Sequence, residues 1–512
     1  MKNRTMYSII CLGSGIGFYL LTRINTFVPI AMPASLFLLL AFSTRTRPGR
    51  GFALLFSGIL LARMALQGLP DGDFMFFLFV LIREGSAALA FTLPFLADRL
   101  LTKAISRRFG SETLIPTMVF PVCATAASFL MARFGLFDGV GTLFAYTYHG
   151  HQSLTVLMSL FGLWGNVFLT TWMVSMALRL RERKGLVISG GILAALLIYG
   201  GISLSPLFRD NHAQTVRTAS VVLNHKGRRG APSMEKILVE PIFTPINPTI
   251  ERLDQLAFRA VEGGAEIVAS QEFLFIVPEN QEQELRRRIT DIALRYRIHL
   301  VVHYVSFPPL LPNSEREYFG DIPDRNDEEE GRSVAILVSD DGELLLEYEK
   351  HNISIEETLW FDAGPPDIAV AETRFGSIAV VICRDLSFPS FLRIASQKGA
   401  GLVIAPSYET LEAPEVSYLQ AYRGVESGFS VLRPTANGLS VAMDSRGRIL
   451  SEMNQFTTDR ELMFADLPVE NRRTLYSLVG DFLGWVSVCA IFIFAVISII
   501  IRRKRTDTDI DT

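Results

Sequence analysis

Long apolar runs separated by short polar loops fill residues 1–209, and one further run lies near the C-terminus. A helix needs about 20 mainly apolar residues to cross the hydrocarbon core of a bilayer. Most of these runs reach that length, and a soluble core rarely contains so many, so the pattern predicts eight transmembrane helices. They cover residues 7–22, 27–43, 51–68, 74–97, 114–132, 153–178, 186–204 and 478–501.

The loops between these runs alternate in charge. Lysine and arginine cluster at the N-terminus, in every second loop and in the C-terminal tail, whereas the other loops are nearly free of positive charge. Because such clusters mark cytoplasmic loops, we expect both termini in the cytoplasm and the region between the last two runs outside. In a bacterium with an outer membrane this predicts a multi-pass protein of the inner membrane with a periplasmic domain.

Residues 210–472 have the mixed pattern of a globular domain. Short apolar runs such as "EIVAS" alternate with amphipathic helical segments such as "TIERLDQLAFRAVEGGA", which ends at Gly263 and Gly264. The stretch 332–350 predicts a hairpin with a two-residue Asp341-Gly342 turn. This alternation favours an α/β domain with a mixed sheet covered by helices. The predicted organisation is a membrane domain of about seven helices at 1–209, an extracytoplasmic domain at 210–472, and a final transmembrane helix with a basic cytoplasmic tail at 473–512.

Charge and cysteine content narrow the chemistry. A net charge of -3 provides no general electrostatic attraction for nucleic acid. Of the four cysteines, only Cys383 lies in 210–472, so no disulfide is expected within that region. The sequence contains no glycine-rich phosphate loop and no metal-ligand motif, and we expect no cofactor and no metal.

Three reactive side chains follow apolar strand-like runs: Glu272, Lys350 and Cys383. Sites in α/β sheets collect at the carboxyl ends of strands. A cysteine nucleophile needs a base and a nearby positive charge, so Glu272 fits a general base. Lys350 fits stabilisation of the thiolate and of an oxyanion. Each residue alone has an ordinary alternative: a surface ion pair for Glu272, a solvated strand end for Lys350, and a buried core cysteine for Cys383.

The order Glu272, Lys350, Cys383 resembles the Glu-Lys-Cys order of the nitrilase superfamily. Together with the eight predicted spans, it resembles the apolipoprotein N-acyltransferases within that superfamily. The stretch "AYRGVESGFSVLRPTANGLSVAMDSRGRI" is similar to that family's Arg, Glu, Arg, Asn-Gly run through Arg423, Glu426, Arg433, Asn437 and Gly438. The resemblance implies a four-layer αββα sandwich beside the membrane helices. It also implies that an acyl chain moves from a phospholipid to a Cys383 thioester, and then to the N-terminal diacylglyceryl-cysteine amine of an apolipoprotein. The implied partners are the phospholipid donor, the diacylated apolipoprotein and the bilayer.

The sequence departs from the family pattern around the three reactive residues. "HNISIEETLWFDAG" follows Lys350, which makes Glu357 the best candidate for an auxiliary glutamate and Glu356 the next. Arg384 and Asp385 replace a Tyr-Glu pair. We expect Asp385 to orient Arg384 or a neighbouring backbone amide, the alternative being an ion pair that faces solvent at the strand end. "PSYE" at 406–409 replaces an Asn-Asp-Ala-Trp word, a change that concerns substrate recognition.

Two other functions remain open from the sequence. A membrane-anchored amidase would use the same three residues but transfer the acyl group to water. A non-catalytic paralogue would keep the fold for binding, although drift should then damage at least one of three dispersed polar residues. Several spans argue against the amidase, because an enzyme with a soluble substrate needs only one anchor.

Overall fold

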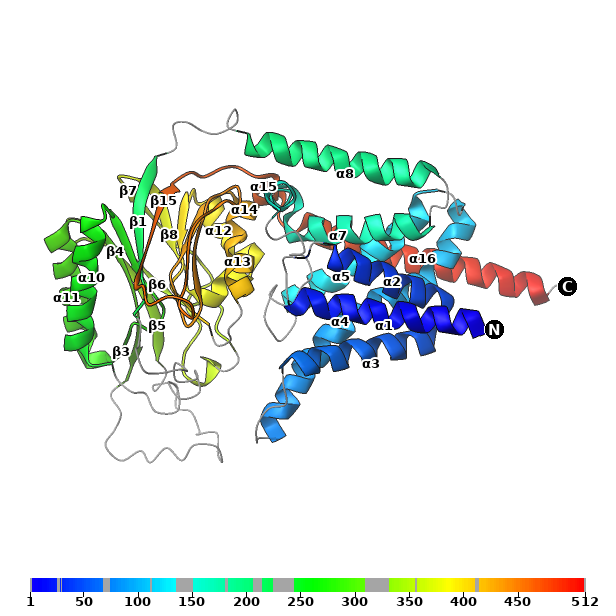
Figure 1. Cartoon of the computed structure of the whole chain (residues 1–512), viewed down its shortest axis with the longest axis horizontal. Helices are drawn as coiled ribbons and strands as arrows, with labels where there is room; N and C mark the ends of the chain where they lie inside the picture. The colour runs from blue at the N-terminus through cyan, green and yellow to red at the C-terminus, as the bar shows by residue number, and fades with distance from the viewer. Residues whose placement is uncertain are drawn as a thin grey trace. The chain divides into compact units, whose positions relative to one another are not determined.

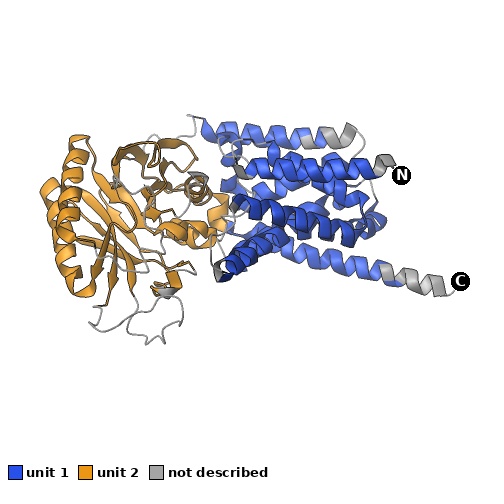
Figure 2. Ribbon diagram, turned by 60° about the horizontal axis from the view of Figure 1, so that its bottom comes forward, with its two compact units in different colours: residues 1–208, 479–512 blue, residues 209–478 orange. Residues whose placement is uncertain are grey.

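The computed structural model of this chain describes residues 2–24, 28, 30–67, 74–110, 113–134, 151–179, 183–205, 214–223, 244–308, 331–354, 357–409 and 414–510. The chain forms two compact units, which Figure 2 shows in different colours. The first contains Met1–Phe208 and Val479–Thr512, and the second contains Arg209–Leu478.

The first unit is entirely helical in its described part. Six of its helices are long and apolar enough to cross a membrane, and two predicted runs give shorter apolar helices, Ala31–Arg45 and Gly190–Leu204. The helices are α1 (Lys2–Ile24), α2 (Ala31–Arg45), α3 (Pro48–Gln67), α4 (Phe74–Phe109), α5 (Val119–Phe134), α6 (Gln152–Thr155), α7 (Met158–Arg179), α8 (Arg183–Leu204) and α16 (Phe482–Ile510).

Ion pairs between helices lie inside the described part of this unit. Arg63 of α3 donates to Glu84 of α4 at 2.6 Å, and both are buried. Arg179 of α7 donates to both carboxylate oxygens of Asp98 of α4, at 2.6 and 2.5 Å. An isolated charge is costly in an apolar environment, so these pairs allow charged residues to lie within otherwise apolar helices.

The second unit is an α/β sandwich of four layers (Figure 1). Helices α10 (Ile246–Glu262) and α11 (Glu279–Tyr296) cover one sheet, and α12 (Pro389–Gln397), α13 (Pro414–Ala421) and α14 (Arg423–Ser427) cover the other. Apolar residues from α10, α11 and the first sheet form one continuous core. The predicted mixed sheet is therefore two mixed sheets packed between helical layers, as the αββα expectation required.

The first sheet has seven strands in the order β15-β1-β2-β4-β5-β6, with β3 also paired to β4. The second has six, in the order β14-β13-β11-β9-β8-β7, and β10 pairs with β12 beside it. The strands are β1 (Thr215–Val221), β2 (Ile267–Ser270), β3 (Phe275–Pro278), β4 (His299–Phe307), β5 (Arg332–Val338), β6 (Leu344–Glu349), β7 (Val370–Thr373), β8 (Gly376–Val380), β9 (Leu402–Ile404), β10 (Ser407–Tyr408), β11 (Ser430–Arg433), β12 (Thr435–Ala436), β13 (Leu439–Met443), β14 (Ile449–Asn454) and β15 (Leu462–Pro468).

Strand pairing fixes both the ends of this unit and the places of its reactive residues. The first strand of the unit, β1, lies antiparallel to its last strand, β15, with Thr215 opposite Pro468. Strand β2 runs parallel to β1, and β8 runs parallel to β9. Glu272 follows β2 and Lys350 follows β6 in the first sheet, whereas Cys383 follows β8 in the second.

The hairpin between β5 and β6 differs from the two-residue turn predicted at Asp341-Gly342. The Ser339 N–H donates to the Glu343 carbonyl at 2.8 Å, so three residues lie between the closing pair. Gly342 has φ +82, the left-handed conformation that glycine adopts without strain. A three-residue loop with glycine at its last position is the next most common hairpin connection, and the Asp-Gly dipeptide alone does not distinguish the two.

Candidate active site

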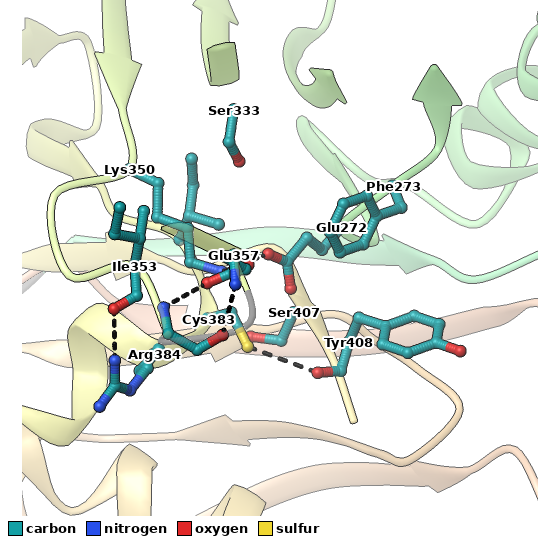
Figure 3. A network of polar contacts seen from close by, with 12 residues as sticks. Glu272, Phe273, Ser333, Lys350, Ile353, Glu357, Cys383, Arg384, Ser407 and Tyr408 are labelled. Carbon is teal, nitrogen blue, oxygen red and sulfur yellow. Dashed lines mark hydrogen bonds and ion pairs between the residues drawn. The ribbon is translucent and has the colours of Figure 1, made fainter. Parts of the chain in front are cut away.

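Lys350 lies between two buried carboxylates. Its Nζ donates to Oε1 of Glu272 at 2.8 Å and to Oε1 of Glu357 at 2.6 Å. The side chains are only 1–2% exposed, and Figure 3 shows them pointing toward one another beside Cys383. Burial alone would lower the pKa of Lys350, but the carboxylates of Glu272 and Glu357 outweigh it and raise this pKa well above its ordinary value. The amine therefore stays positively charged.

Glu357 is the auxiliary carboxylate that the structure places next to this lysine. It begins the short 3₁₀ helix η4 (Glu357–Leu359), and its Oε2 accepts the Ser354 N–H at 2.7 Å. Glu356, the other candidate, lies outside the described residues. Glu272 and Glu357 thus share one cation.

The environment of Glu272 suits a base. Burial raises the pKa of this carboxyl to about 7, the Lys350 ammonium acts in the opposite direction, and the Glu357 carboxylate adds to the rise. The nearby Cys383 side chain acts to lower the pKa. A base is most useful when its pKa lies near the working pH, and Glu272 meets this condition.

Cys383 is held in a strained backbone conformation at the start of η5 (Cys383–Ser387). Its φ is +43, which is uncommon for a residue other than glycine. Its N–H donates to the Pro406 carbonyl at 2.9 Å, and its Sγ donates to the Tyr408 carbonyl at 3.4 Å. Burial and the Glu272 carboxylate raise the pKa of the thiol, against the opposing effect of Lys350. The sulfur therefore rests as a thiol, and a reaction through the thiolate would need a base nearby.

Asp385 connects the segment that begins at Cys383 to β6 and the loop after it. Its Oδ2 accepts the Tyr348 hydroxyl at 2.7 Å and the Ile382 N–H at 3.0 Å. Its Oδ1 accepts the Asn352 N–H at 2.8 Å and the Asn352 side-chain amide at 2.9 Å. The carboxylate is fully buried, and Arg384 donates to the Ile353 carbonyl. The ion pair facing solvent is therefore wrong, and the contacts of Asp385 are to backbone amides and neutral side chains.

Replacing Asp385 with Asn should slow acylation of Cys383 by roughly tenfold or more, because an amide cannot accept all four hydrogen bonds and leaves buried donors unpaired. The rate of acyl-enzyme formation and the thermal unfolding midpoint would be measured together. Glu284→Gln is the control, since Glu284 pairs with Arg287 on the surface at 2.7 Å and such pairs contribute roughly 0–1 kcal/mol. Equal rates in the two variants would contradict a positioning role for Asp385.

His303 was not predicted from the sequence; it lies on β4 and is completely buried. Its Nδ1 accepts the Phe273 N–H at 2.9 Å, and its Nε2 lies 3.0 Å from the Ser333 hydroxyl. Since Nδ1 is an acceptor, Nε2 carries the hydrogen. Burial, with a smaller effect of Lys350, keeps the pKa of His303 well below its ordinary value. A neutral histidine thus fixes Phe273, whose φ is +54, directly after Glu272. Its signal in the sequence was a polar residue inside an otherwise apolar strand.

The residues of the "AYRGVESGFSVLRPTANG" stretch form buried polar contacts. Arg423 pairs with Glu426 at 2.8 Å, and both side chains are fully buried. Arg433 pairs with Glu409, and the side-chain amide of Asn437 donates to the Glu409 carbonyl at 2.6 Å. Arg433 and Glu409 act electrostatically on Cys383, so this stretch contributes to the surroundings of the thiol.

Comparison with known proteins finds one matching family and several related proteins. The carbon-nitrogen hydrolase family matches residues 240–476. An apolipoprotein N-acyltransferase of Synechocystis sp. is 34% identical over 139 residues, which are 26% of this chain and 24% of the relative. An omega-amidase of Saccharomyces cerevisiae is 25% identical over 203 residues, which are 36% of this chain and 63% of the relative. In each case the match spans less than two thirds of the relative's length.

Among solved structures, an amidase from Nesterenkonia sp. is 22% identical, with a TM-score of 0.38. The alignment covers 51% of this chain and 93% of the amidase.

Proposed function

Because the chain belongs, through residues 240–476, to the carbon-nitrogen hydrolase or nitrilase superfamily, we propose that it is a membrane-bound N-acyltransferase. It moves an acyl chain from a phospholipid, through a thioester on Cys383, to the N-terminal diacylglyceryl-cysteine amine of an apolipoprotein. One arrangement carries the proposal: a lysine ammonium held by two buried carboxylates beside a cysteine. The apolar helices of the first unit support lipid substrates.

In the first step Glu272 takes the thiol proton as Sγ attacks the ester carbonyl carbon of the phospholipid. The negative charge that develops on the carbonyl oxygen is stabilised by the Lys350 ammonium. As the tetrahedral intermediate collapses, the bond from carbon to the glycerol oxygen breaks. That oxygen takes the proton from Glu272, and a lysophospholipid leaves.

In the second step the amine of the acceptor attacks the thioester carbon, and Glu272 takes a proton from the amine. Lys350 again stabilises the oxyanion. The carbon–sulfur bond breaks as the amide forms, and the thiolate regains a proton. The same base and cation thus serve both half-reactions, in agreement with their shared contacts around one thiol.

The proposed location follows from the loop charges. Clustered lysine and arginine in alternate loops and in both termini favour the inner membrane, with the catalytic unit on the periplasmic side. A phospholipid and a diacylated apolipoprotein would both present their reactive groups at that face of the bilayer.

Hydrolysis is the second candidate. The match to the yeast omega-amidase extends over 63% of that enzyme, a larger share than the acyltransferase match covers. An amidase would use Glu272, Lys350 and Cys383 in the same roles, with water in place of the amine. The two candidates therefore differ in the acyl acceptor, and the test must compare acceptors.

The test traps the acyl-enzyme. The purified full chain is incubated with a phospholipid whose acyl chain is labelled and with no acceptor, and the label should attach to the protein and be released by hydroxylamine. Cys383→Ala and Cys383→Ser should form no thioester, because a neutral hydroxyl is a far weaker nucleophile. A diacylated lipopeptide added next should receive the label as an amide.

Two outcomes would contradict the proposed function. If the unmodified protein forms no thioester, the acyltransferase reaction is excluded. If a thioester forms but its label passes to water and never to the lipopeptide, the amidase candidate replaces it.

A further inference from the structure

A third carboxylate, Glu409, has its backbone fixed beside the thiol. It directly follows Tyr408, whose carbonyl accepts the Cys383 Sγ hydrogen bond at 3.4 Å. Its own N–H donates to the Ala436 carbonyl at 3.0 Å, and its carbonyl accepts the Asn437 side-chain amide at 2.6 Å. The main chain of Glu409 is therefore fixed on both sides by the segment that contains β12.

The side chain of Glu409 is also held in place. Arg433, which is fully buried, donates to its Oε1. The other donors of Arg433 go to neutral acceptors, Gln420 at 3.0 Å, Ser417 at 2.5 Å and Thr435 at 2.8 Å. A Cβ on Gly438 would come within 2.7 Å of the Glu409 Cγ, so glycine at 438 leaves room for this carboxylate. The position of the group is set before any ligand arrives.

One part of this carboxylate is available. The Glu409 side chain is 13% exposed to solvent, whereas the Arg433 side chain is fully buried. Oε2 of Glu409 accepts no hydrogen bond from any residue that the structure describes. A carboxylate can accept several hydrogen bonds, and the Glu409 carboxylate, unlike the Arg433 guanidinium, belongs to a side chain that a ligand can reach.

The charges around the sulfur favour a cation. Lys350 and Arg433 are positive, and Glu272, Glu357 and Glu409 are negative when ionised, so three carboxylates face two cations. After burial and Glu272, Glu409 also raises the pKa of the Cys383 thiol, whereas Lys350 and Arg433 lower it. Glu409 is thus within electrostatic range of the Cys383 sulfur, and when Glu272 is ionised the carboxylates exceed the cations by one charge, which attracts a positively charged group.

We infer that Glu409 binds the primary ammonium group of the acyl acceptor next to Cys383. The inference rests on the proposed acyl transfer and names the residue that selects an amine over water. The bound ammonium loses one proton to Glu272, which passes it to solvent. The neutral amine then forms the carbon–nitrogen bond as the carbon–sulfur bond breaks. The nitrogen loses its second proton in this step, and that proton goes to the thiolate.

The test separates the two half-reactions in the full-length protein with Glu409→Gln. The thioester is formed from labelled phosphatidylglycerol, which carries no amine, and is then mixed with a diacylated lipopeptide or with buffer alone. We expect aminolysis to fall roughly tenfold or more through a higher KM for the lipopeptide, since a charged hydrogen bond is lost. The readout is the ratio of aminolysis to hydrolysis of the preformed thioester, which should fall by the same factor.

Two further variants complete the test. Glu452→Gln is the matched control: Glu452 accepts the Tyr418 hydroxyl at 2.7 Å in the same unit, and aminolysis should be unchanged. Glu409→Asp keeps the charge and should recover part of the aminolysis rate. If Glu409→Gln fails to fold, Glu409→Asp still tests the inference, because moving the carboxylate back by one methylene should raise the KM for the lipopeptide without an equal effect on hydrolysis. The thermal unfolding midpoint is recorded for all three.

Other results would overturn the inference. A primary ammonium also occurs in the headgroup of phosphatidylethanolamine. If Glu409→Gln slows only thioester formation from that donor and not from phosphatidylglycerol, the bound ammonium is the donor's. Equal loss of aminolysis and hydrolysis would mean that Glu409 only supports the fold. Failure of the unmodified protein to form a thioester would instead refute the proposed function, and this inference with it.

Discussion

Replacing Lys350 with Ala is expected to abolish acyl transfer. The oxyanion loses its charge partner, an effect of about 10²–10³ in rate where one such donor is removed. Two buried carboxylates are also left without their shared cation, and breaking a buried pair costs about 3–5 kcal/mol of folding free energy. Single-turnover thioester formation and the denaturation midpoint would be measured on the same preparation.

Lys350→Arg is the matched control for this experiment. It keeps the positive charge between Glu272 and Glu357, so the unfolding midpoint should recover more than the rate does, because a planar guanidinium does not reproduce the contacts of an ammonium at 2.6 and 2.8 Å. Near-normal turnover in Lys350→Ala would show that the assignment of Glu272, Lys350 and Cys383 is wrong.

Glu272→Gln should block both formation and aminolysis of the thioester. In the unmodified protein, burial raises the pKa of Glu272 to about 7. Below that pH the carboxyl is protonated and cannot accept the thiol proton, so the acylation rate should rise about tenfold per pH unit up to about 7 and then level off. Single-turnover rates from about pH 5 to 9 would record this profile.

Replacing Glu357 with Gln tests whether the charge of Glu357 contributes to the pH dependence of acylation. The Glu357 carboxylate contributes to the raised pKa of Glu272, and removing its charge should move the rising part of the curve to lower pH. If Glu272→Gln kept the rising limb with its midpoint near 7, another group would be the base.

Strand ends were the part of the site that could be predicted from the sequence. Glu272 and Cys383 each follow a short apolar run, and a reactive residue at the end of a buried strand stands out in the pattern. The helices of the first unit could be predicted for a similar reason, because each follows from a run of apolar residues within a single segment of the chain. Two of them give apolar segments of fewer than 18 residues, Ala31–Arg45 and Gly190–Leu204, and the second is part of the longer helix α8.

The supporting contacts could not be predicted, because their partners lie far apart in the chain. Asp385 binds Tyr348 and Asn352, which come from the other sheet and the loop after it. His303 accepts a hydrogen bond from the Phe273 N–H, and Glu409 forms an ion pair with Arg433. A sequence pattern reports which side chains are buried, but the geometry of packed sheets decides which donor meets which acceptor.

The pairing of β1 with β15 has a consequence for how the protein is built. With Thr215 opposite Pro468, the segments that enter and leave the catalytic unit start from neighbouring positions on one sheet. A module whose ends are adjacent can be inserted into a loop of another protein without stretching either partner. Residues 209–478 therefore enter and leave between α8 and α16 as one continuous insertion whose two ends start from the same edge of one sheet.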